Sequence, residues 1–228
     1  MVTIMLQRDP KRDLRPTLRP AALVAAAVLY ALGTGIGIWA VSTGARHTGE
    51  YALDRTIAGD RGTIVADISK VINVVFGPAV GPVWLLLLCL VLWRTLGRTV
   101  ALRAGLLTLV GWFSIEVFKM LFHRHRPPTA AVHALVVETQ PDSFPSGHTA
   151  FTAALVAAFF VALAGHRTLR RVVLLAGIPL IVVVAASRLV VGAHYLADVV
   201  AAPLLATATI AAVVGLGLTG RRGDRPQV

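Results

Sequence analysis

Apolar positions along this chain gather into six long runs separated by short polar stretches. Each run has about 20 residues, the length that an α-helix needs to cross the hydrocarbon core of a bilayer. The predicted spans are residues 20–41, 71–93, 104–122, 148–164, 172–190 and 195–218. The pattern therefore predicts an all-α, polytopic membrane protein with six transmembrane helices.

The second predicted span and the segment before it carry helix-breaking and polar residues. Gly77-Pro78 and Gly81-Pro82 fall inside segment 71–93, and proline removes a helix hydrogen bond, so we expect a kink there. Segment 42–70 mixes charges of both signs and could hold a short interfacial helix. A secretory signal peptide is the alternative for segment 20–41, although its apolar run is longer than a usual signal core.

The composition supports a membrane protein. Of the 228 residues, 56% are hydrophobic and only 14% are charged, whereas a soluble domain carries roughly a quarter charged residues. The net charge of +11 comes from basic clusters beside the apolar runs, at residues 8–19, 94–103, 167–171 and 221–225. Positive charge marks cytoplasmic loops, so we expect a cytoplasmic-membrane protein with both termini inside. No aromatic residues interleave with these clusters, which argues against a nucleic-acid partner.

This orientation places every candidate polar cluster on the outer side of the membrane. We predict one domain at residues 20–218, between a basic cytoplasmic segment at 1–19 and a cytoplasmic tail at 219–228. The loops at 42–70, 123–145 and 191–194 would then face outside. Spans three to six would bring their polar ends together there, so we expect an active site at the extracytoplasmic ends of the helices.

His194 and Asp198 form the first candidate pair. A spacing of four residues would place both side chains on one face of a helix. The carboxylate can then accept a hydrogen bond from one ring nitrogen and leave the other nitrogen free as a nucleophile. The alternative is a histidine at the membrane interface beside a helix-capping aspartate.

Pro145-Ser146-Gly147-His148 lies where the fourth predicted span begins. Glycine lets backbone N–H groups approach a ligand, and a helix N-terminus favours anions. Ser146 could add a hydroxyl donor, and His148 could protonate a leaving alkoxide. The alternative is an ordinary turn that starts a helix. From the residues alone, the nucleophile could be either His194 or His148.

Three cations lie at or just beyond span ends, namely Lys119, Arg126 and Arg188. Together they could neutralise the oxygens of a transferring phosphoryl group. Singly, each could be a side chain that extends along the bilayer to reach the headgroups. A converging set would supply positive charge without a metal ion or another cofactor.

Together, these clusters resemble the three-part signature of the type-2 phosphatidic acid phosphatase family, at every signature position. They read Lys119-x6-Arg126-Pro127, Pro145-Ser146-Gly147-His148 and Ser187-Arg188-x5-His194-x3-Asp198. The resemblance covers the third to the sixth predicted span, and six spans are what the integral membrane members of that family have.

The resemblance implies a role for each residue. His194 would be the nucleophile, oriented by Asp198, and His148 would be the general acid and then the base for water. The phosphate-binding residues would be Lys119, Arg126, Ser146, Gly147 and Arg188. The implied enzyme needs no metal and hydrolyses a lipid phosphate of the bilayer through a phosphohistidine. Its substrate could be phosphatidate, phosphatidylglycerol phosphate or a polyprenyl diphosphate.

Two other classes of function are weighed against this one. A vanadate-dependent haloperoxidase has similar anion-binding residues, but the six apolar spans count against it. A membrane transporter or a non-catalytic lipid-phosphate-binding protein could also carry charges near its spans. Phosphate release from a lipid phosphate would distinguish a phosphatase from a transporter or a binding protein.

The remaining polar residues receive structural interpretations. Glu116, one turn before Lys119, is expected to pair with it, and Asn73 is expected to form a helix–helix hydrogen bond. Three histidines of the outer loop have no cysteine nearby and are expected to contact water or headgroups instead of a metal ion. They are His123, His125 and His133.

Overall fold

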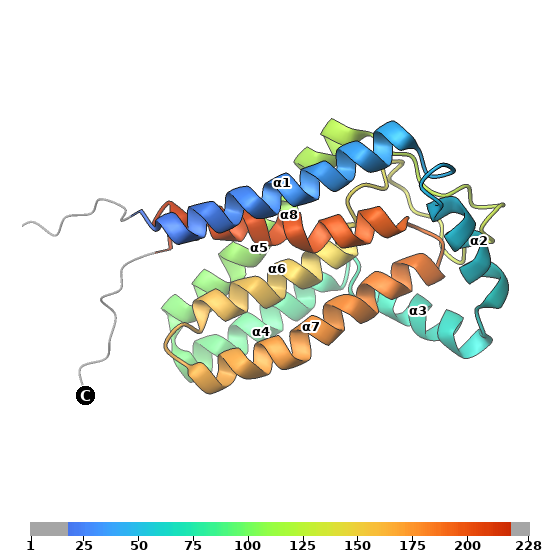
Figure 1. Ribbon diagram of the computed structural model, residues 1–228. Helices are drawn as coiled ribbons and strands as arrows, with labels where there is room; N and C mark the ends of the chain where they lie inside the picture. The colour runs from blue at the N-terminus through green and yellow to red at the C-terminus, as the bar shows by residue number, and fades with distance from the viewer. Residues whose placement is uncertain (1–17, 220–228) are drawn as a thin grey trace, which may run out of the picture.

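The computed structural model describes residues 18–219, which form eight α-helices (Figure 1). The helices are α1 (Pro20–Thr43), α2 (Glu50–Asp60), α3 (Thr63–Val75), α4 (Gly81–Leu96), α5 (Arg98–Phe122), α6 (Gly147–Ala162), α7 (Arg167–Val190) and α8 (Leu196–Gly215). The described part is therefore all-α, as the apolar pattern predicts. Most of the predicted N-terminal segment and of the predicted tail lie outside the described residues.

Six of these helices are apolar and pack into one bundle. Helices α1, α5, α7 and α8 are long and apolar enough to cross a membrane, while α4 and α6 are apolar but have 16 residues each. The outer surface of the bundle exposes large apolar side chains, such as Leu86 at 68% and Leu175 at 77%. Apolar surface on this scale is typical of contact with lipid, since water would disfavour it.

The prediction of one kinked span over residues 71–93 is wrong. Helix α3 ends at Val75, the chain turns through residues 76–80, and α4 begins at Gly81. Pro78 and Pro82 explain the break, because proline lacks the N–H that continues a helix and disfavours helical backbone in the residue before it. Segment 42–70 also holds more structure than one short helix, since α2 and most of α3 lie in it.

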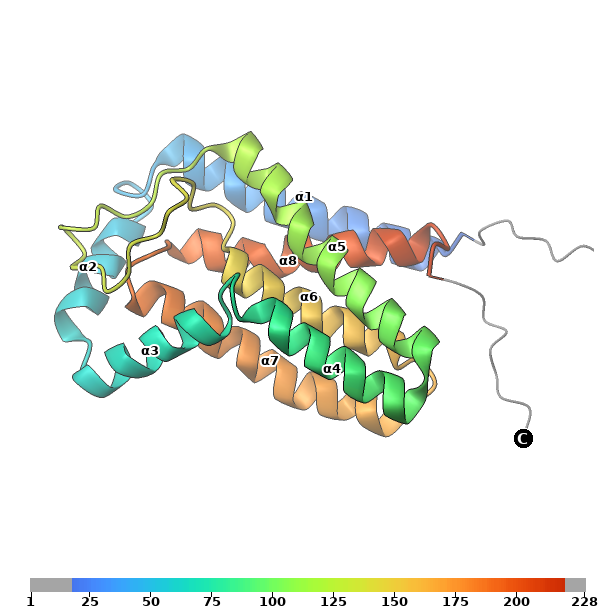
Figure 2. The same ribbon diagram turned by 180° about the vertical axis from the view of Figure 1, so that it is seen from behind.

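Helix α6 lies inside the bundle, against α5, α7 and α8 (Figure 2). Its buried alanines share one core with alanines of α8, and small side chains of this kind let helices approach closely. Helix α1 packs along α8 in the same way. A Cβ on Gly33 would lie 2.7 Å from Leu205, and the hydroxyls of Tyr30 and Thr209 are 2.9 Å apart. Helix α1 is thus an integral part of the bundle, which disfavours the signal-peptide alternative.

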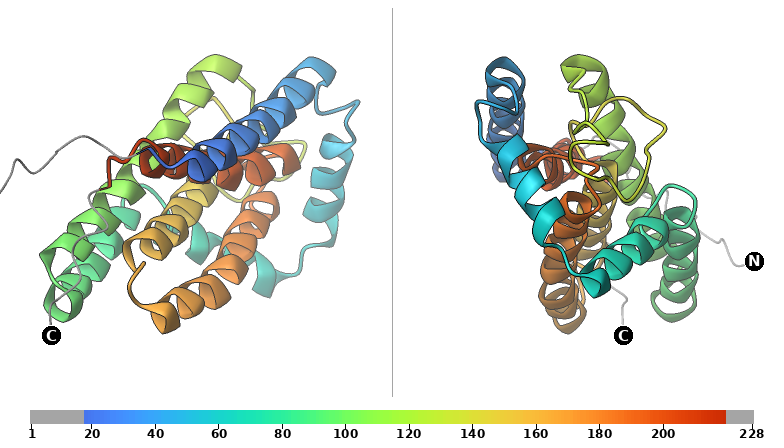
Figure 3. Two further views of the ribbon diagram at one scale, coloured as in Figure 1. Left: turned by 60° about the vertical axis from the view of Figure 1, so that its left-hand side comes forward. Right: turned by 90° about the vertical axis from the view of Figure 1, so that its right-hand side faces the viewer.

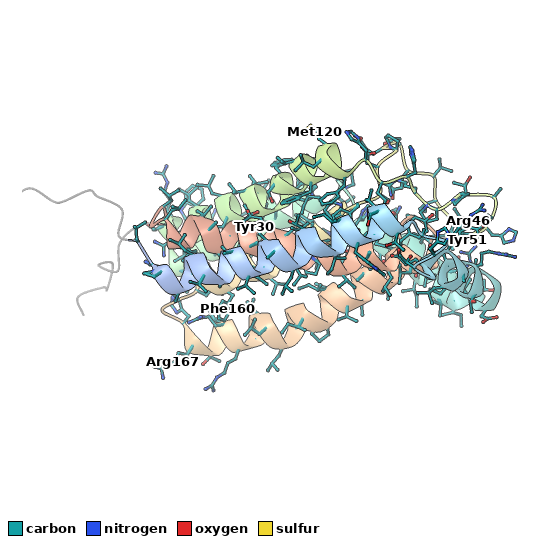
Figure 4. The ribbon with its side chains drawn as sticks, turned by 45° about the horizontal axis from the view of Figure 1, so that its top comes forward. Tyr30, Arg46, Tyr51, Met120, Phe160 and Arg167 are labelled. Carbon is teal, nitrogen blue, oxygen red and sulfur yellow. The ribbon has the colours of Figure 1, made fainter. Side chains whose placement is uncertain are left out.

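Helices α2 and α3 and the long segment 123–146 cover one end of the bundle (Figure 3). The opposite end holds residues 18 and 219, where the described chain begins and ends (Figure 1). Figure 4 shows Arg46 and Tyr51 at the covered end and Arg167 at the other. Helices α5 and α7 finish at the covered end, and α6 and α8 start there. The fold therefore gathers all the predicted site residues at this end.

Candidate active site

His194 lies in the turn between α7 and α8 and is 1% exposed. Its Nδ1 is 3.5 Å from Asp198 Oδ2, and its Nε2 is 3.1 Å from Arg126 Nη1. Arginine can only donate, so Nε2 is the acceptor and a neutral ring carries its proton on Nδ1, toward Asp198. Burial lowers the pKa of His194 well below its ordinary value, and Arg126 and Arg188 lower it further. The imidazole is therefore neutral, with its Nε2 lone pair directed at a cation.

Asp198 lies where it fits both interpretations that the sequence offered, as a helix cap and as a neighbour of His194. Its Oδ2 accepts the backbone N–H of Tyr195 at 2.9 Å and so caps α8, while the same oxygen faces His194. Its Oδ1 accepts a hydrogen bond from Arg124 Nη1. The carboxylate is fully buried, so its orientation is fixed by these partners.

Arg124 joins this carboxylate to helix α2. Its second terminal nitrogen donates to Glu50 Oε2, and Glu50 Oε1 accepts the N–H of Ala197 at 2.7 Å. The guanidinium lies 4.5 Å from the ring centre of Tyr195. Although burial lowers the pKa of Arg124, Asp198 and Glu50 raise it above its ordinary value. Both Arg124 and Glu50 were missed from the sequence, because they occupy no signature position and only the folded chain shows which loop charges turn inward.

Asp54 is a third buried carboxylate in this region, one helical turn after Glu50. It is 1% exposed, and neither of its oxygens has a hydrogen-bond partner among residues 18–219. Burial, together with the nearby Asp198 and Glu50, raises its pKa to about 8. The Asp54 side chain is therefore mostly neutral at pH 7.

The start of α6 is tied to the start of α8. Ser146 precedes the first residue of α6, and its N–H donates to Asp198 O at 3.1 Å. Lys119, in the last turn of α5, places its Nζ 3.8 Å from where a Cβ on Gly147 would lie. The expected pair with Glu116 is confirmed, with a distance of 3.1 Å from Lys119 Nζ to Oε1. A lysine ammonium thus lies beside the positive end of a helix, an arrangement that favours an anion.

Arg188, at the end of α7, is fully buried and uses both terminal nitrogens. One donates to Asn73 Oδ1 and the other to Glu138 Oε1. Asn73 also contacts His148, whose Nε2 lies 3.0 Å from the Asn73 carbonyl oxygen. Asn73 therefore bonds to two predicted site residues, in addition to joining α3 to α7 as a helix–helix contact. The sequence offered no signal for this, since Asn73 lies in the segment predicted as a span.

Glu138 is a further residue that sequence reasoning missed. It lies in the loop before α6, outside every signature position. Burial raises the pKa of its carboxyl, but Arg188 and then Arg126 outweigh burial and lower the pKa below its ordinary value. Glu138 is therefore an anion that lies on a cation expected to bind phosphate.

These residues surround a cavity of about 240 Å³. Its polar wall includes Lys119, Arg126, Glu138, Gly147, His148 and His194. Phe76, Pro78 and Trp112 form an apolar wall. The other predicted residues hold or flank this wall, since Asp198 faces His194, Ser146 precedes Gly147, and Arg188 binds Glu138. The three loop histidines are exposed, as expected.

Comparison with known proteins identifies a family model and a solved structure. A model described as the PAP2 superfamily matches residues 99–220, just over half of the chain. The fold is similar to the crystal structure of a transmembrane PAP2-type phosphatidylglycerolphosphate phosphatase from Bacillus subtilis, with a TM-score of 0.71 and 19% sequence identity. The match covers 87% of this chain and 98% of the other. No curated protein matches the chain.

Proposed function

The chain belongs to the PAP2 superfamily, and from that premise we propose that it is a membrane-embedded phosphatase that hydrolyses a phosphate ester or diphosphate of a lipid. One observation carries the proposal. A buried, neutral His194 presents Nε2 to a cavity that Lys119 and Arg126 also line. A nitrogen lone pair among fixed cations is suited to attack phosphorus in an anionic group.

The reaction would proceed in two steps. In the first, His194 Nε2 forms a bond to phosphorus while the bond from phosphorus to the lipid oxygen breaks, and His148 gives that oxygen a proton. Asp198 stabilises the positive charge that develops on the His194 ring. In the second step, His148 takes a proton from water, the water oxygen bonds to phosphorus, and the nitrogen–phosphorus bond breaks. Inorganic phosphate leaves and both histidines return to their starting states.

Phosphate binding would exchange two contacts of the unliganded site. Arg126 would move its hydrogen bond from His194 Nε2 to a phosphate oxygen, and Arg188 would release Glu138. Lys119, the Ser146 hydroxyl and the N–H group of Gly147 would bind the remaining oxygens. These protein groups supply positive charge at the oxygens, so the proposed reaction requires no metal ion.

We place α1, α4, α5, α6, α7 and α8 across the cytoplasmic membrane, within one domain at residues 20–218. The basic clusters at 94–103 and 167–171 join these helices at the end opposite the cavity. Their positive charge supports a cytoplasmic location for this end of the bundle and for both termini. The cavity then faces outside. Helices α4 and α6 are about 24 Å long, and a modest local thinning of the bilayer accommodates them.

The cavity's two walls support a lipid substrate. The phosphoryl group would bind the cations, while Phe76 and Trp112 would contact the apolar part of the molecule next to it. Phosphatidate, phosphatidylglycerol phosphate and a polyprenyl diphosphate all present this combination. The name of the Bacillus subtilis structure makes phosphatidylglycerol phosphate the first substrate to test.

Phosphate release from these three lipids by purified protein in detergent tests the proposal. We expect release by the wild type, unchanged by excess EDTA, and none by His194→Ala. Folded wild-type protein that releases no phosphate from any of them would contradict the enzyme assignment and favour a transport or binding function. Activity that disappears with EDTA and returns with magnesium would contradict the metal-independent mechanism.

A further inference from the structure

Helix α3 presents its apolar residues away from the protein. Ile64, Ile68 and Val71 are 76%, 55% and 61% exposed, whereas Ala66 and Ser69 are buried and α3 packs on α7. On a helix with 3.6 residues per turn, the three apolar side chains fall within a sector of about 60°. A helix with small residues inward and large apolar residues outward needs an apolar environment on its outer side.

The bilayer surface fits this face. Helix α3 lies across the end of the bundle (Figure 3) and is followed, after one turn, by the apolar helix α4. Its 13 residues are too few to span. Its charged residues, Asp67 and Lys70, are exposed, lie beside the apolar sector and pair at 3.1 Å. An apolar sector with charges along one side fits a helix that lies in the boundary between headgroups and acyl chains.

The last turn of α3 contacts two predicted site residues, Arg188 and His148, through Asn73. Its side-chain oxygen accepts a hydrogen bond from one Arg188 nitrogen, and Glu138 accepts from the other. A neutral amide fixes the guanidinium without cancelling its charge. Displacement of Glu138 alone would therefore free the second nitrogen and the charge of Arg188 for an anion.

The backbone of the same residue holds His148. In a continuing helix the Asn73 carbonyl would accept the N–H of Gly77, but that N–H lies 3.3 Å from Val74 O. The free carbonyl accepts from His148 Nε2 instead. Gly77 makes room for this contact, because a Cβ there would lie 2.7 Å from Asn73 O and 3.4 Å from His148 Nε2. This contact fixes the orientation of the His148 ring, because a carbonyl oxygen can only accept and Nε2 must therefore carry a proton.

We propose that α3 is embedded by its apolar face in the outer surface of the bilayer, and that Asn73 at its end is a positioning residue for Arg188 and His148. The role of Asn73 in positioning Arg188 and His148 rests on the proposed phosphatase function. The membrane part concerns only where α3 lies.

The membrane part is tested without any reaction. Two variants are made in a Cys89→Ser background, Ile68→Cys and Asp67→Cys. Each is labelled at its single cysteine with an environment-sensitive fluorophore and reconstituted into vesicles of phosphatidylcholine and phosphatidylglycerol. Lipids with a spin label near the headgroup end of the acyl chain should quench the label at residue 68 several-fold more than the label at residue 67. Equal quenching, or stronger quenching at residue 67, would overturn the embedding of α3.

The positioning part is tested with two variants of Asn73 and a control. Asn73→Ala should lower kcat/KM on the order of tenfold to a hundredfold. Asn73→Asp keeps an acceptor for Arg188 but adds a competing charge, so KM and the vanadate inhibition constant should rise several-fold. Ser69→Ala, one turn earlier on the same buried face, should stay within about twofold of wild type.

Different outcomes would contradict the positioning role of Asn73 and the phosphatase function. If Asn73→Asp binds vanadate as wild type does, the side chain has only a structural role and the positioning proposal is wrong. A Gly77→Ala variant with unchanged kcat would contradict the His148 contact. If the wild type binds vanadate but hydrolyses no lipid phosphate, the phosphatase proposal fails. The quenching experiment and the vanadate affinity of Asn73→Asp would still decide where α3 lies and whether Asn73 positions Arg188.

Discussion

Three carboxylates and one guanidinium lie buried together behind His194. Arg124 pairs with Glu50 and Asp198, while Asp54 has no hydrogen-bond partner among the described residues. One arginine charge cannot offset three carboxylate charges in a buried region. Protonation of Asp54 reduces this imbalance, and burial, followed by Asp198 and Glu50, raises the pKa of Asp54 to about 8.

The buried Asp54 predicts how stability depends on pH. Between its ordinary pKa of 3.8 and the folded value of about 8, the folded protein holds a proton that the unfolded chain releases. Stability therefore falls as pH rises through this window. Asp54→Asn should remove that part of the slope and stabilise the protein at pH 8, as measured by thermal unfolding in detergent. The exposed Asp67→Asn is the control, and equal slopes in both variants would contradict the prediction.

The position of Glu138 on Arg188 leads to a prediction about how tightly the site binds anions. Because its carboxylate lies on Arg188, a phosphate or vanadate ion has to displace it. Glu138→Gln removes the competing charge, so vanadate, which mimics five-coordinate phosphorus, should inhibit at several-fold lower concentration. Glu116→Gln, at the exposed carboxylate of the same cavity, should have a smaller effect. Weaker vanadate inhibition in Glu138→Gln would show that the carboxylate assists anion binding instead.

At the scale of helices, periodicity and hydropathy predicted most of the bundle. Helices α1, α5, α7 and α8 lie where long apolar runs placed them, because lipid contact makes such runs continuous. The segment at residues 50–96, which holds α2, α3 and α4, was predicted poorly. Hydropathy averages over the Gly77-Pro78 break, so α3 and α4 were joined, and the mixed charges of α2 gave no apolar run to detect.

Arg124 connects three elements, so its removal should affect both stability and catalysis. Arg124→Ala leaves Glu50 and Asp198 as unpaired buried charges, at a cost of about 3–5 kcal/mol. The melting temperature should fall clearly, and turnover should fall because Asp198 loses its orientation toward His194. Arg46→Ala, an exposed arginine that contacts Tyr51 at the same end, is the control and should melt near wild type. Equal melting temperatures would contradict a structural role for the network.

At the scale of the whole molecule, the fold gathers residues that are far apart in sequence. The signature alone sufficed to predict the eight candidate residues, and the structure brings all eight around one cavity or directly behind it. The signature could not predict the contacts that Asn73, Glu50, Arg124 and Glu138 make with these residues, because none of the four occupies a signature position. Their positions depend on how α2, α3 and the loop before α6 fold over the end of the bundle.

The proposed orientation of the molecule can be tested with single cysteines. His133 and Thr168 are exposed at opposite ends of the bundle. In a Cys89→Ser background, His133→Cys should react with an impermeant thiol reagent in intact cells, because its loop faces outside. Thr168→Cys should react only after lysis. The reverse pattern would move the cavity to the cytoplasmic face.

The most direct test of the account is to trap the phosphorylated enzyme. A radiolabelled lipid phosphate is mixed with wild-type protein and quenched within one turnover, and the labelled peptide is identified. We predict an acid-labile, alkali-stable phosphohistidine at His194, absent from His194→Ala and longer-lived in His148→Ala once an activated ester has formed it, because water activation is lost. Turnover without any such intermediate, or label retained in His194→Ala, would contradict the central claim that His194 is the nucleophile.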